Sequence, residues 1–133
     1  MRSNRKWCKR RGSSLECQNC FFVYPIIDSN LKNFGTVKIK RLASNEIAIY
    51  GLTQCHKVCS KTYLYLYLER KVNGSYGTYK YWEFTGSNAG HLERTIDVAV
   101  PSGTYYRVRG YHAASNGGLK ESTSTLTSGI LVN

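Results

Sequence analysis

The sequence predicts an all-β domain, a sandwich of seven short antiparallel strands preceded by a cysteine-rich extension. The composition favours strands, since 11 of the 133 residues are tyrosines, 12 are glycines and only 2 are prolines. From residue 34 onward, apolar and polar residues alternate in segments that turn signals separate. No segment shows the apolar spacing of an amphipathic helix. A chain of this length is expected to form one domain with its own core.

Residues 1–33 are predicted to be a basic N-terminal extension, and residues 34–133 the sandwich itself. Six of the 19 basic side chains lie in the first twelve residues, and the net charge of the chain is +11. Such an arm suits anionic polymers or membrane surfaces, or it serves only to keep the protein soluble. The apolar stretch Phe21–Ile27 contains a proline, so we expect an edge strand there rather than a secretory signal. No segment approaches the length of a membrane span.

The first two strands of the sandwich are predicted at Thr36–Leu42 and Glu46–Thr53. Apolar residues alternate with polar ones in both segments, and a turn at Ser44-Asn45 separates them. The next segment, Gln54–Lys61, is expected to be a loop because it breaks the alternation.

The third and fourth strands, Thr62–Val72 and Thr78–Thr85, show the clearest alternation. Asn73-Gly74 marks the reversal between them, and the connection is expected to extend through Ser75 and Gly77. A loop is predicted to follow at 86–90. Side chains alternate across a strand, so these two strands have an apolar inner face and an aromatic outer face. The predicted inner residues are Leu64, Leu66, Leu68, Trp82 and Phe84.

The last three strands are predicted at Leu92–Val100, Thr104–Ala113 and Ser122–Val132. A turn at Pro101-Ser102-Gly103 leads into the sixth strand, and glycines at 117 and 118 mark the turn before the seventh. In the sixth strand, the inner face is predicted to hold Tyr106, Val108, Gly110 and His112.

The segment Val100–Arg109 resembles the start of the sixth strand in fibronectin type III domains, where a Pro/Gly turn precedes Thr-x-Tyr-x-Val. The segment Ala113–Gly118, followed by Glu121-Ser122, is similar to that family's loop into the seventh strand. The resemblance implies an immunoglobulin-like sandwich in which the third, fourth and sixth strands share a sheet. It also implies that the Tyr106 hydroxyl bonds back to the backbone near the start of its strand. The chain departs from the family in having Trp82 in the fourth strand instead of a tryptophan in the second.

The combination of sandwich and extension also resembles small secreted β-sandwich proteins of Gram-positive bacteria whose function is uncharacterised. This resemblance implies a secreted or surface location, with any signal peptide already absent, and no enzymatic activity. A cytoplasmic location is the alternative. Neither resemblance names a ligand.

The shared sheet of the type III resemblance would carry a polar, aromatic outer face. Cross-strand tyrosine pairs and arginine–tyrosine contacts would stabilise such a face even without a ligand. Tyrosine and arginine are also favoured in interfaces, so the face is a candidate for binding a protein or a glycan, or for self-association. The predicted binding residues are Tyr63, Tyr65, Tyr67, Tyr79, Tyr81, Tyr105, Arg107, Arg109 and Tyr111.

Five cysteines leave one thiol over if the others form disulfides. The odd cysteine is predicted to be Cys8, as a free or intermolecular thiol. One alternative is a tetrahedral zinc held by the four thiols of Cys17, Cys20, Cys55 and Cys59, with His56 able to replace one. The other alternative is that these cysteines are unpaired structural thiols. In the disulfide reading, Cys55 and Cys59 either bridge to each other or pair with Cys17 and Cys20, which would attach the extension to the sandwich. The disulfide candidates are Cys17, Cys20, Cys55 and Cys59.

No catalytic residue is predicted, and an enzyme is not expected. Cys55 and His56 are sequence neighbours, which does not place an imidazole correctly against a thiol. The lone histidines His91 and His112 and the scattered carboxylates form no acid–base pair. No organic cofactor is predicted, and zinc is only the alternative to disulfides.

The sequence therefore predicts a non-enzymatic, secreted or surface-associated binding or assembly module. One alternative is a subunit of a surface polymer, linked through the N-terminal extension. Another is an intracellular, zinc-clipped module whose basic arm binds nucleic acid, which the sequence does not favour.

Overall fold

The computed structural model describes residues 34–133, and the backbone of two short strands before them, β1 (Lys6–Arg10) and β2 (Ser14–Glu16), which pair antiparallel. The prediction of an all-β chain is confirmed, since the described residues contain strands and turns and no helix. The stretch Phe21–Ile27 lies outside the described residues. The further strands are β3 (Gly35–Ala43), β4 (Glu46–Val72), β5 (Ser75–Ala99), β6 (Thr104–Asn116), β7 (Leu119–Leu126) and β8 (Ile130–Val132).

Strands β3 to β8 form one six-stranded antiparallel sheet. Its order is β3-β4-β6-β7, with β5 also paired to β4 and β8 also paired to β6. The first part of β4, Glu46–Thr53, lies between β3 and the end of β5. A later part, Lys61–Arg70, lies between the start of β5 and β6. Each half of β4 is therefore the centre of a separate group of strands.

Two predicted loops, Gln54–Lys61 and 86–90, are wrong, because both segments are part of long strands. The register between β4 and β5 shifts between Gln54 and Cys59, so both strands bend together while their hydrogen bonding resumes on either side. The second and third predicted strands are consequently joined in β4, and the fourth and fifth in β5. The seventh predicted strand is divided into β7 and β8.

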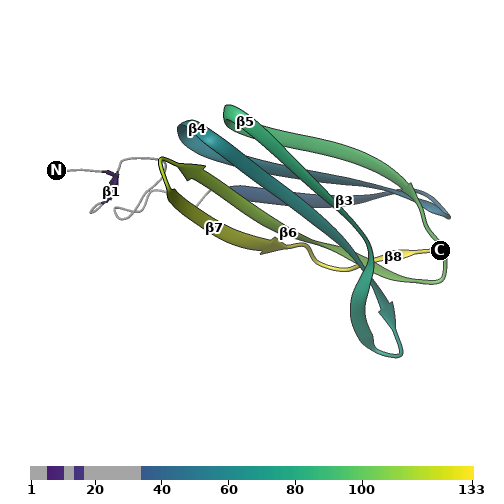
Figure 1. The fold of residues 1–133 in the computed structure, drawn as a ribbon. Helices are drawn as coiled ribbons and strands as arrows, with labels where there is room; N and C mark the ends of the chain where they lie inside the picture. The colour runs from purple at the N-terminus through teal and green to yellow at the C-terminus, as the bar shows by residue number, and fades with distance from the viewer. Residues whose placement is uncertain (1–5, 11–13, 17–33) are drawn as a thin grey trace.

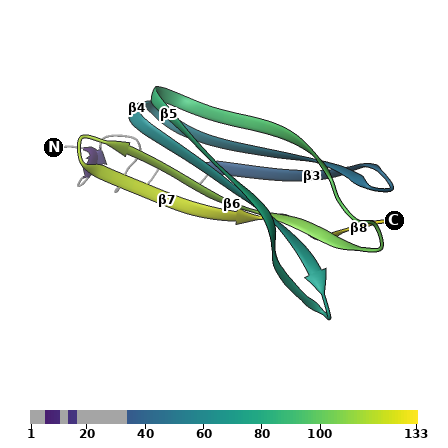
Figure 2. The same ribbon diagram turned by 45° about the vertical axis from the view of Figure 1, so that its right-hand side comes forward.

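The bends bring the two halves of the sheet face to face. Figures 1 and 2 show β4 and β5 each doubling back, so that the sheet curls over on itself. The contact is close at Gly51, where an added Cβ would lie 2.6 Å from Leu66 Cδ2 and 3.1 Å from Leu64 Cδ1. The absence of a side chain at Gly51 therefore allows the first half of β4 to pack directly on the second half.

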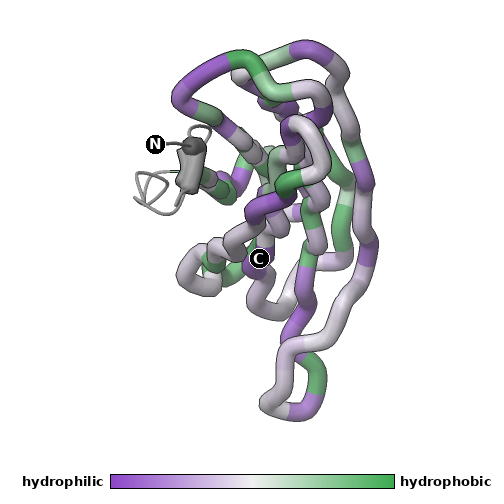
Figure 3. Tube along the Cα trace, turned by 60° about the vertical axis from the view of Figure 1, so that its left-hand side comes forward, coloured by the Kyte–Doolittle hydropathy of each residue, from purple (hydrophilic) through white to green (hydrophobic). Residues whose placement is uncertain are grey.

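The core fills the space inside this curl. Figure 3 shows hydrophobic and hydrophilic residues alternating along the strands, as expected when one face of each strand is buried. Each fully buried aliphatic side chain contributes roughly 1.5–3 kcal/mol to stability. The buried cluster consists of Ile47, Ile49, Leu64, Leu66, Leu68, Leu92, Val98, Val100, Tyr106, Val108 and Val132.

The largest of the fully buried polar side chains, His112, lies between the two halves of the sheet. Its Nδ1 lies 3.1 Å from Thr53 Oγ1 in β4, and its Nε2 lies 2.7 Å from Thr125 Oγ1 in β7. An added Cβ at Gly35 would overlap the His112 ring, and one at Gly110 would lie 2.7 Å from Nε2. The two glycines thus provide the room for an imidazole that hydrogen-bonds to both halves.

Tyr106 makes the hydrogen bond predicted for it. The side chain is fully buried, and its hydroxyl donates to the Pro101 carbonyl at 2.5 Å. The Gly103 amide donates to the Val132 carbonyl at 2.6 Å, which ties β8 to the turn before β6. These bonds fix the chain where it enters β6.

The hairpin between β4 and β5 is tighter than predicted. Val72 pairs with Ser75, so Asn73 and Gly74 alone form the turn, with φ values of 52° and 84°. Positive φ at both central residues matches the right-handed twist of the strands, and Asn-Gly is well suited to it. Tyr76 therefore belongs to a strand, and the hairpin tip projects beyond the rest of the sheet in Figure 1.

Candidate binding face

The outer surface of the half formed by β4, β5, β6 and β7 carries a continuous set of tyrosines and cations. The strand registers place Tyr65 opposite Tyr111, Tyr67 opposite both Tyr81 and Arg109, and Glu69 opposite Arg107. We call this surface the Tyr/Arg face. Its residues are Lys61, Tyr63, Tyr65, Tyr67, Glu69 and Lys71 of β4, Tyr76, Tyr81 and Glu83 of β5, Tyr105, Arg107, Arg109 and Tyr111 of β6, and Lys120 of β7.

The tyrosine rings pack against one another across the strands. The rings of Tyr67 and Tyr81 stack with centroids 5.9 Å apart, and those of Tyr65 and Tyr111 lie 5.3 Å apart at an interplanar angle of 39°. Tyr63 meets the edge of Tyr65 at 6.3 Å. Such pairs stabilise a sheet by about 0.5–1.5 kcal/mol each beyond their burial. The rings therefore form a fixed array.

Cationic side chains lie over the same rings. The Arg109 guanidinium is 4.2 Å from the Tyr67 ring centroid. Arg107 is likewise 4.0 Å from the centroid of the Tyr76 ring, and the Lys120 ammonium is 4.5 Å from the Tyr63 ring. These distances are within the range of favourable cation–π attraction.

Glu69 anchors the two arginines. Its carboxylate accepts hydrogen bonds from Arg107 Nε at 2.7 Å and from Arg109 Nε at 3.0 Å, and the residue is only 7% exposed. Burial by itself raises the pKa of this carboxyl, but the two hydrogen bonds and positive charges outweigh it and hold the pKa below its ordinary value. Glu69 is therefore ionised at neutral pH and orients both guanidinium groups.

The Tyr/Arg face is net positive. It carries the cations Lys61, Lys71, Arg107, Arg109 and Lys120 against only two carboxylates, Glu69 and Glu83. Within residues 34–133, neither Lys61 nor Lys120 forms an ion pair. Their charges are available to an external anion.

A hollow of about 250 Å³ lies in the middle of this face. Its lining combines three tyrosines with two cations, so it offers phenolic hydroxyl groups and positive charge together. The lining residues are Tyr65, Tyr67, Arg109, Tyr111 and Lys120.

The prediction that Tyr79 lies on the outer face is wrong. The register shifts between Leu68 and Glu69, where Lys80 pairs with Leu68 but Thr78 pairs with Glu69. The extra residue in β5 turns the Tyr79 ring toward the core, where it meets the buried Tyr106 ring at 6.3 Å. A bulge of this kind re-aims a side chain without interrupting the strand.

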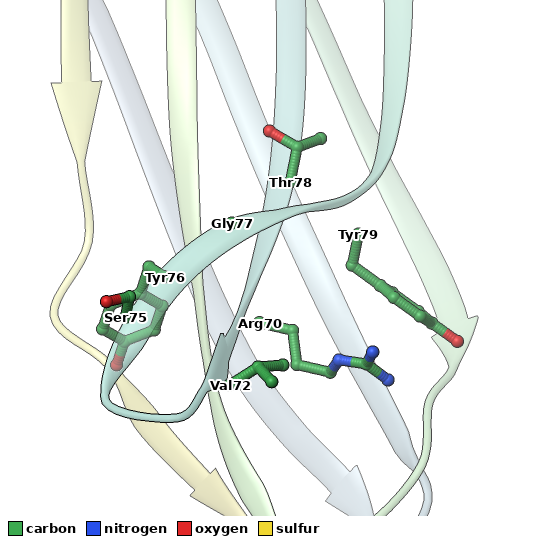
Figure 4. A pocket seen from close by; sticks show the side chains of 7 residues that line it. All are labelled: Arg70, Val72, Ser75, Tyr76, Gly77, Thr78 and Tyr79. Atoms are coloured by element: carbon green, nitrogen blue, oxygen red, sulfur yellow. The ribbon is translucent and has the colours of Figure 1, made fainter.

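Tyr79 instead lines a second hollow, of about 280 Å³, at the base of the hairpin. Figure 4 shows the Arg70 and Tyr79 side chains next to each other, with Tyr76 on the opposite side of the hairpin. The Arg70 guanidinium lies 4.6 Å from the Tyr79 ring centroid. The lining residues are Arg70, Val72, Ser75, Tyr76, Gly77, Thr78 and Tyr79.

Several members of the Tyr/Arg face were not among the predicted binding residues. Lys71 lies in β4 at the same parity as the tyrosines, so alternation alone would have found it. Lys61 was missed because it was assigned to the predicted loop Gln54–Lys61, which is part of β4. Tyr76 can be placed on the face only once the two-residue turn is known, because that turn puts Tyr76 in β5 opposite Lys71. Lys120 was missed because the last strand was predicted to begin at Ser122, whereas β7 begins at Leu119.

The structure partly tests the cysteine predictions. Cys55 is a free thiol, so its two predicted pairings, with Cys59 or with a cysteine of the extension, are both wrong. Burial raises the pKa of the Cys55 thiol to about 12, which keeps it protonated and unreactive at neutral pH. Cys59 is fully buried. The side chains of Cys8, Cys17 and Cys20 lie outside the described residues, so the pairing of Cys59 with the extension, the role of Cys8 and the zinc set remain predictions.

Within the described part of the chain, no group of three or more histidine, cysteine or acidic side chains is placed to hold a metal ion. His56 adjoins Cys55 on the bend of β4 and is exposed. His91 is exposed and pairs with Glu93 at 2.9 Å. In the same residues, no helix is both long and apolar enough to span a membrane.

Comparison with known families places the chain in one of them. The model of a family of unknown function, DUF6147, matches residues 13–129. The chain belongs to this family. The match takes in every strand of the curled sheet except β8. No curated protein and no solved structure matches the chain.

Proposed function

We propose that this DUF6147 member is a non-enzymatic binding or assembly module, secreted or surface-associated, that acts through the Tyr/Arg face. One observation carries the proposal: tyrosines and arginines are held by ring, cation and carboxylate contacts in one outward-facing array. Tyrosine and arginine are enriched where interfaces concentrate their binding energy. Tyr81 and Tyr105, which are 60% and 43% exposed, present large aromatic surfaces to solvent.

The rigidity of this array supports a binding role. Immobilising a flexible side chain at an interface costs about 0.5–1.5 kcal/mol. Glu69 already fixes Arg107 and Arg109, and stacking on Tyr81 fixes Tyr67. A partner would therefore meet side chains whose freedom was lost on folding.

We also propose that the curled sheet is a fibronectin type III-like sandwich whose layers share the bent strands β4 and β5. In support, β3 groups with Glu46–Thr53 and the end of β5, while β6 groups with Lys61–Arg70 and the start of β5. This division puts the third, fourth and sixth predicted strands in one layer, as the family resemblance implies. An experimental structure in which the two groups do not face each other would refute it.

The binding role is tested with a variant that removes the centre of the array, Tyr65→Ser/Tyr81→Ser/Arg109→Ser. A matched control, Lys38→Ser/Lys40→Ser/Tyr50→Ser, alters the outer surface of the other half of the sheet and removes more charge. Sedimentation velocity would measure self-association, and an immobilised panel of surface proteins and glycans would measure binding.

We expect the wild type and the control to bind or self-associate, and the test variant to lose that activity while keeping its circular dichroism spectrum. If the folded test variant behaves like the wild type in every assay, the Tyr/Arg face only stabilises the sheet. The same conclusion follows if the wild type neither binds nor self-associates.

A further inference from the structure

We infer that the Tyr/Arg face binds a linear acidic polysaccharide, laid along β4 and β6 with its carboxylate or sulfate groups on the cations. The inference rests on the proposed function and names its ligand class. It is carried by how the cations are spaced, by the lining of the central hollow and by the coverage of the ring faces.

The cations extend along the strands over a polymer-sized distance. Lys61 and Lys120 both lie opposite Ser115, at one end of the face. Arg109 and Arg107 lie further along β6, and Lys71 is ten residues from Lys61 in β4. At about 3.4 Å per residue, the row is roughly 34 Å long. No small molecule spans that length, whereas a chain with repeated negative charges does.

The hollow is suited to one charged sugar unit. Its volume of about 250 Å³ is smaller than the pockets, typically about 300–1,000 Å³, that hold drug-sized ligands. Arg109 uses its Nε–H for Glu69, which leaves its other donors for an anion, and Lys120 lies over the Tyr111 ring at 5.9 Å. Both cations can form charge-assisted hydrogen bonds to a carboxylate or sulfate. The hydroxyls of Tyr65 and Tyr111 complement sugar hydroxyl groups.

The same geometry disfavours a nucleic acid at this face. Single-stranded binding uses free aromatic faces on which bases stack. Here Tyr67 has Tyr81 on one side and the Arg109 guanidinium close to its ring, and Tyr65 contacts both Tyr63 and Tyr111. Stacking a base would require breaking these contacts. At the centre of the face, around Tyr65 and Tyr67, the available groups are therefore cations and phenolic hydroxyls rather than open ring surfaces.

The test measures binding of the full chain to four immobilised polymers: a heparin-type sulfated glycan, polygalacturonate, neutral dextran and single-stranded DNA. Arg109→Gln/Lys120→Gln is compared with Lys38→Gln/Lys40→Gln, which removes the same charge from the opposite outer surface. Both variants keep the basic N-terminal arm and lose two positive charges, so they differ only in which outer surface has lost them. We expect affinity for at least one acidic glycan to fall tenfold or more in the first variant and less than twofold in the second.

Two additional variants guard against an effect on folding. Lys120→Gln alone leaves the Glu69–Arg109 contact intact and should still weaken glycan binding at least threefold. Tyr65→Phe/Tyr111→Phe keeps the ring contacts and removes two hydroxyls, so we expect glycan binding to weaken, whereas a purely structural role of these tyrosines would leave binding unchanged.

Equal losses in the two double variants would overturn the inference, because binding would then follow net charge or the arm. Equal binding to dextran, or tighter binding to DNA, would also overturn it. If no glycan binds but Tyr65→Ser/Tyr81→Ser/Arg109→Ser abolishes self-association or protein binding, the ligand class is wrong and the proposed function stands.

Discussion

The buried His112 should make the fold sensitive to mild acid. Burial lowers the pKa of this imidazole from 6.5 to about 4, because the interior penalises the charged form. The unfolded chain binds a proton at higher pH than the folded chain does, so stability is full above about pH 6.5 and falls as the pH drops toward 4. At about 1.36 kcal/mol per pKa unit, the total loss is about 3 kcal/mol, of which about 2 kcal/mol is lost by pH 5.

Urea denaturation at pH 7.5, 6 and 5 would measure this loss, with His112→Gln as the comparison. Glutamine keeps an amide that can reach Thr53 and Thr125 but does not titrate. We therefore expect the variant to be less stable than the wild type at pH 7.5 and to lack the fall of stability with pH that His112 causes. The exposed His56 and His91 are present in both proteins and cancel in the difference. A wild-type loss below about 0.5 kcal/mol between pH 7.5 and 5, or an equal slope in His112→Gln, would refute the reasoning.

Three further substitutions test the contacts around the core by chemical denaturation. Thr62→Val should stabilise the protein by about 1 kcal/mol, because the buried Thr62 hydroxyl has no hydrogen-bond partner among the described residues, and a loss would contradict this. Tyr106→Phe should cost about 1–2 kcal/mol by removing the bond to the Pro101 carbonyl, whereas Tyr105→Phe at the exposed neighbour should cost less than about 0.5 kcal/mol. Glu69→Gln should cost about 1–3 kcal/mol at neutral pH. Because the pKa of Glu69 is lowered on folding, the wild type should lose this stabilisation as the pH falls below the ordinary carboxyl pKa, and the variant should lack that loss. Equal acid dependence of stability in the two proteins would contradict the anchoring role.

Alternation in the sequence predicted the faces of β4 and β6 well. The predicted inner residues Leu64, Leu66 and Leu68 are fully buried, as are Tyr106 and His112. The pattern works there because each strand has one face on the core and one toward solvent, so burial follows sequence parity. The same parity placed most of the tyrosines of the outer face correctly.

The bends and the bulge were not predictable from local pattern. Gln54–Lys61 lacks alternation and was therefore expected to be a loop, although hydrogen bonding to β5 carries the strand through the bend. Tyr79 changes sides because of a register shift between two strands, and register is a property of the pair. Lys120 joins the site only through the pairing of β7 with β6. These features depend on contacts between segments far apart in the sequence.

The most direct test of the Tyr/Arg face follows the tyrosine ring signals by NMR while an acidic polysaccharide is added. Individual Tyr→Phe variants assign the rings, and Tyr50 on the opposite outer surface serves as the internal control. If the face is the binding surface, the signals of Tyr65, Tyr67 and Tyr111 shift with ligand concentration and that of Tyr50 does not. Shifts at Tyr50 equal to those of the face, or no shift at any of these rings, would contradict the account.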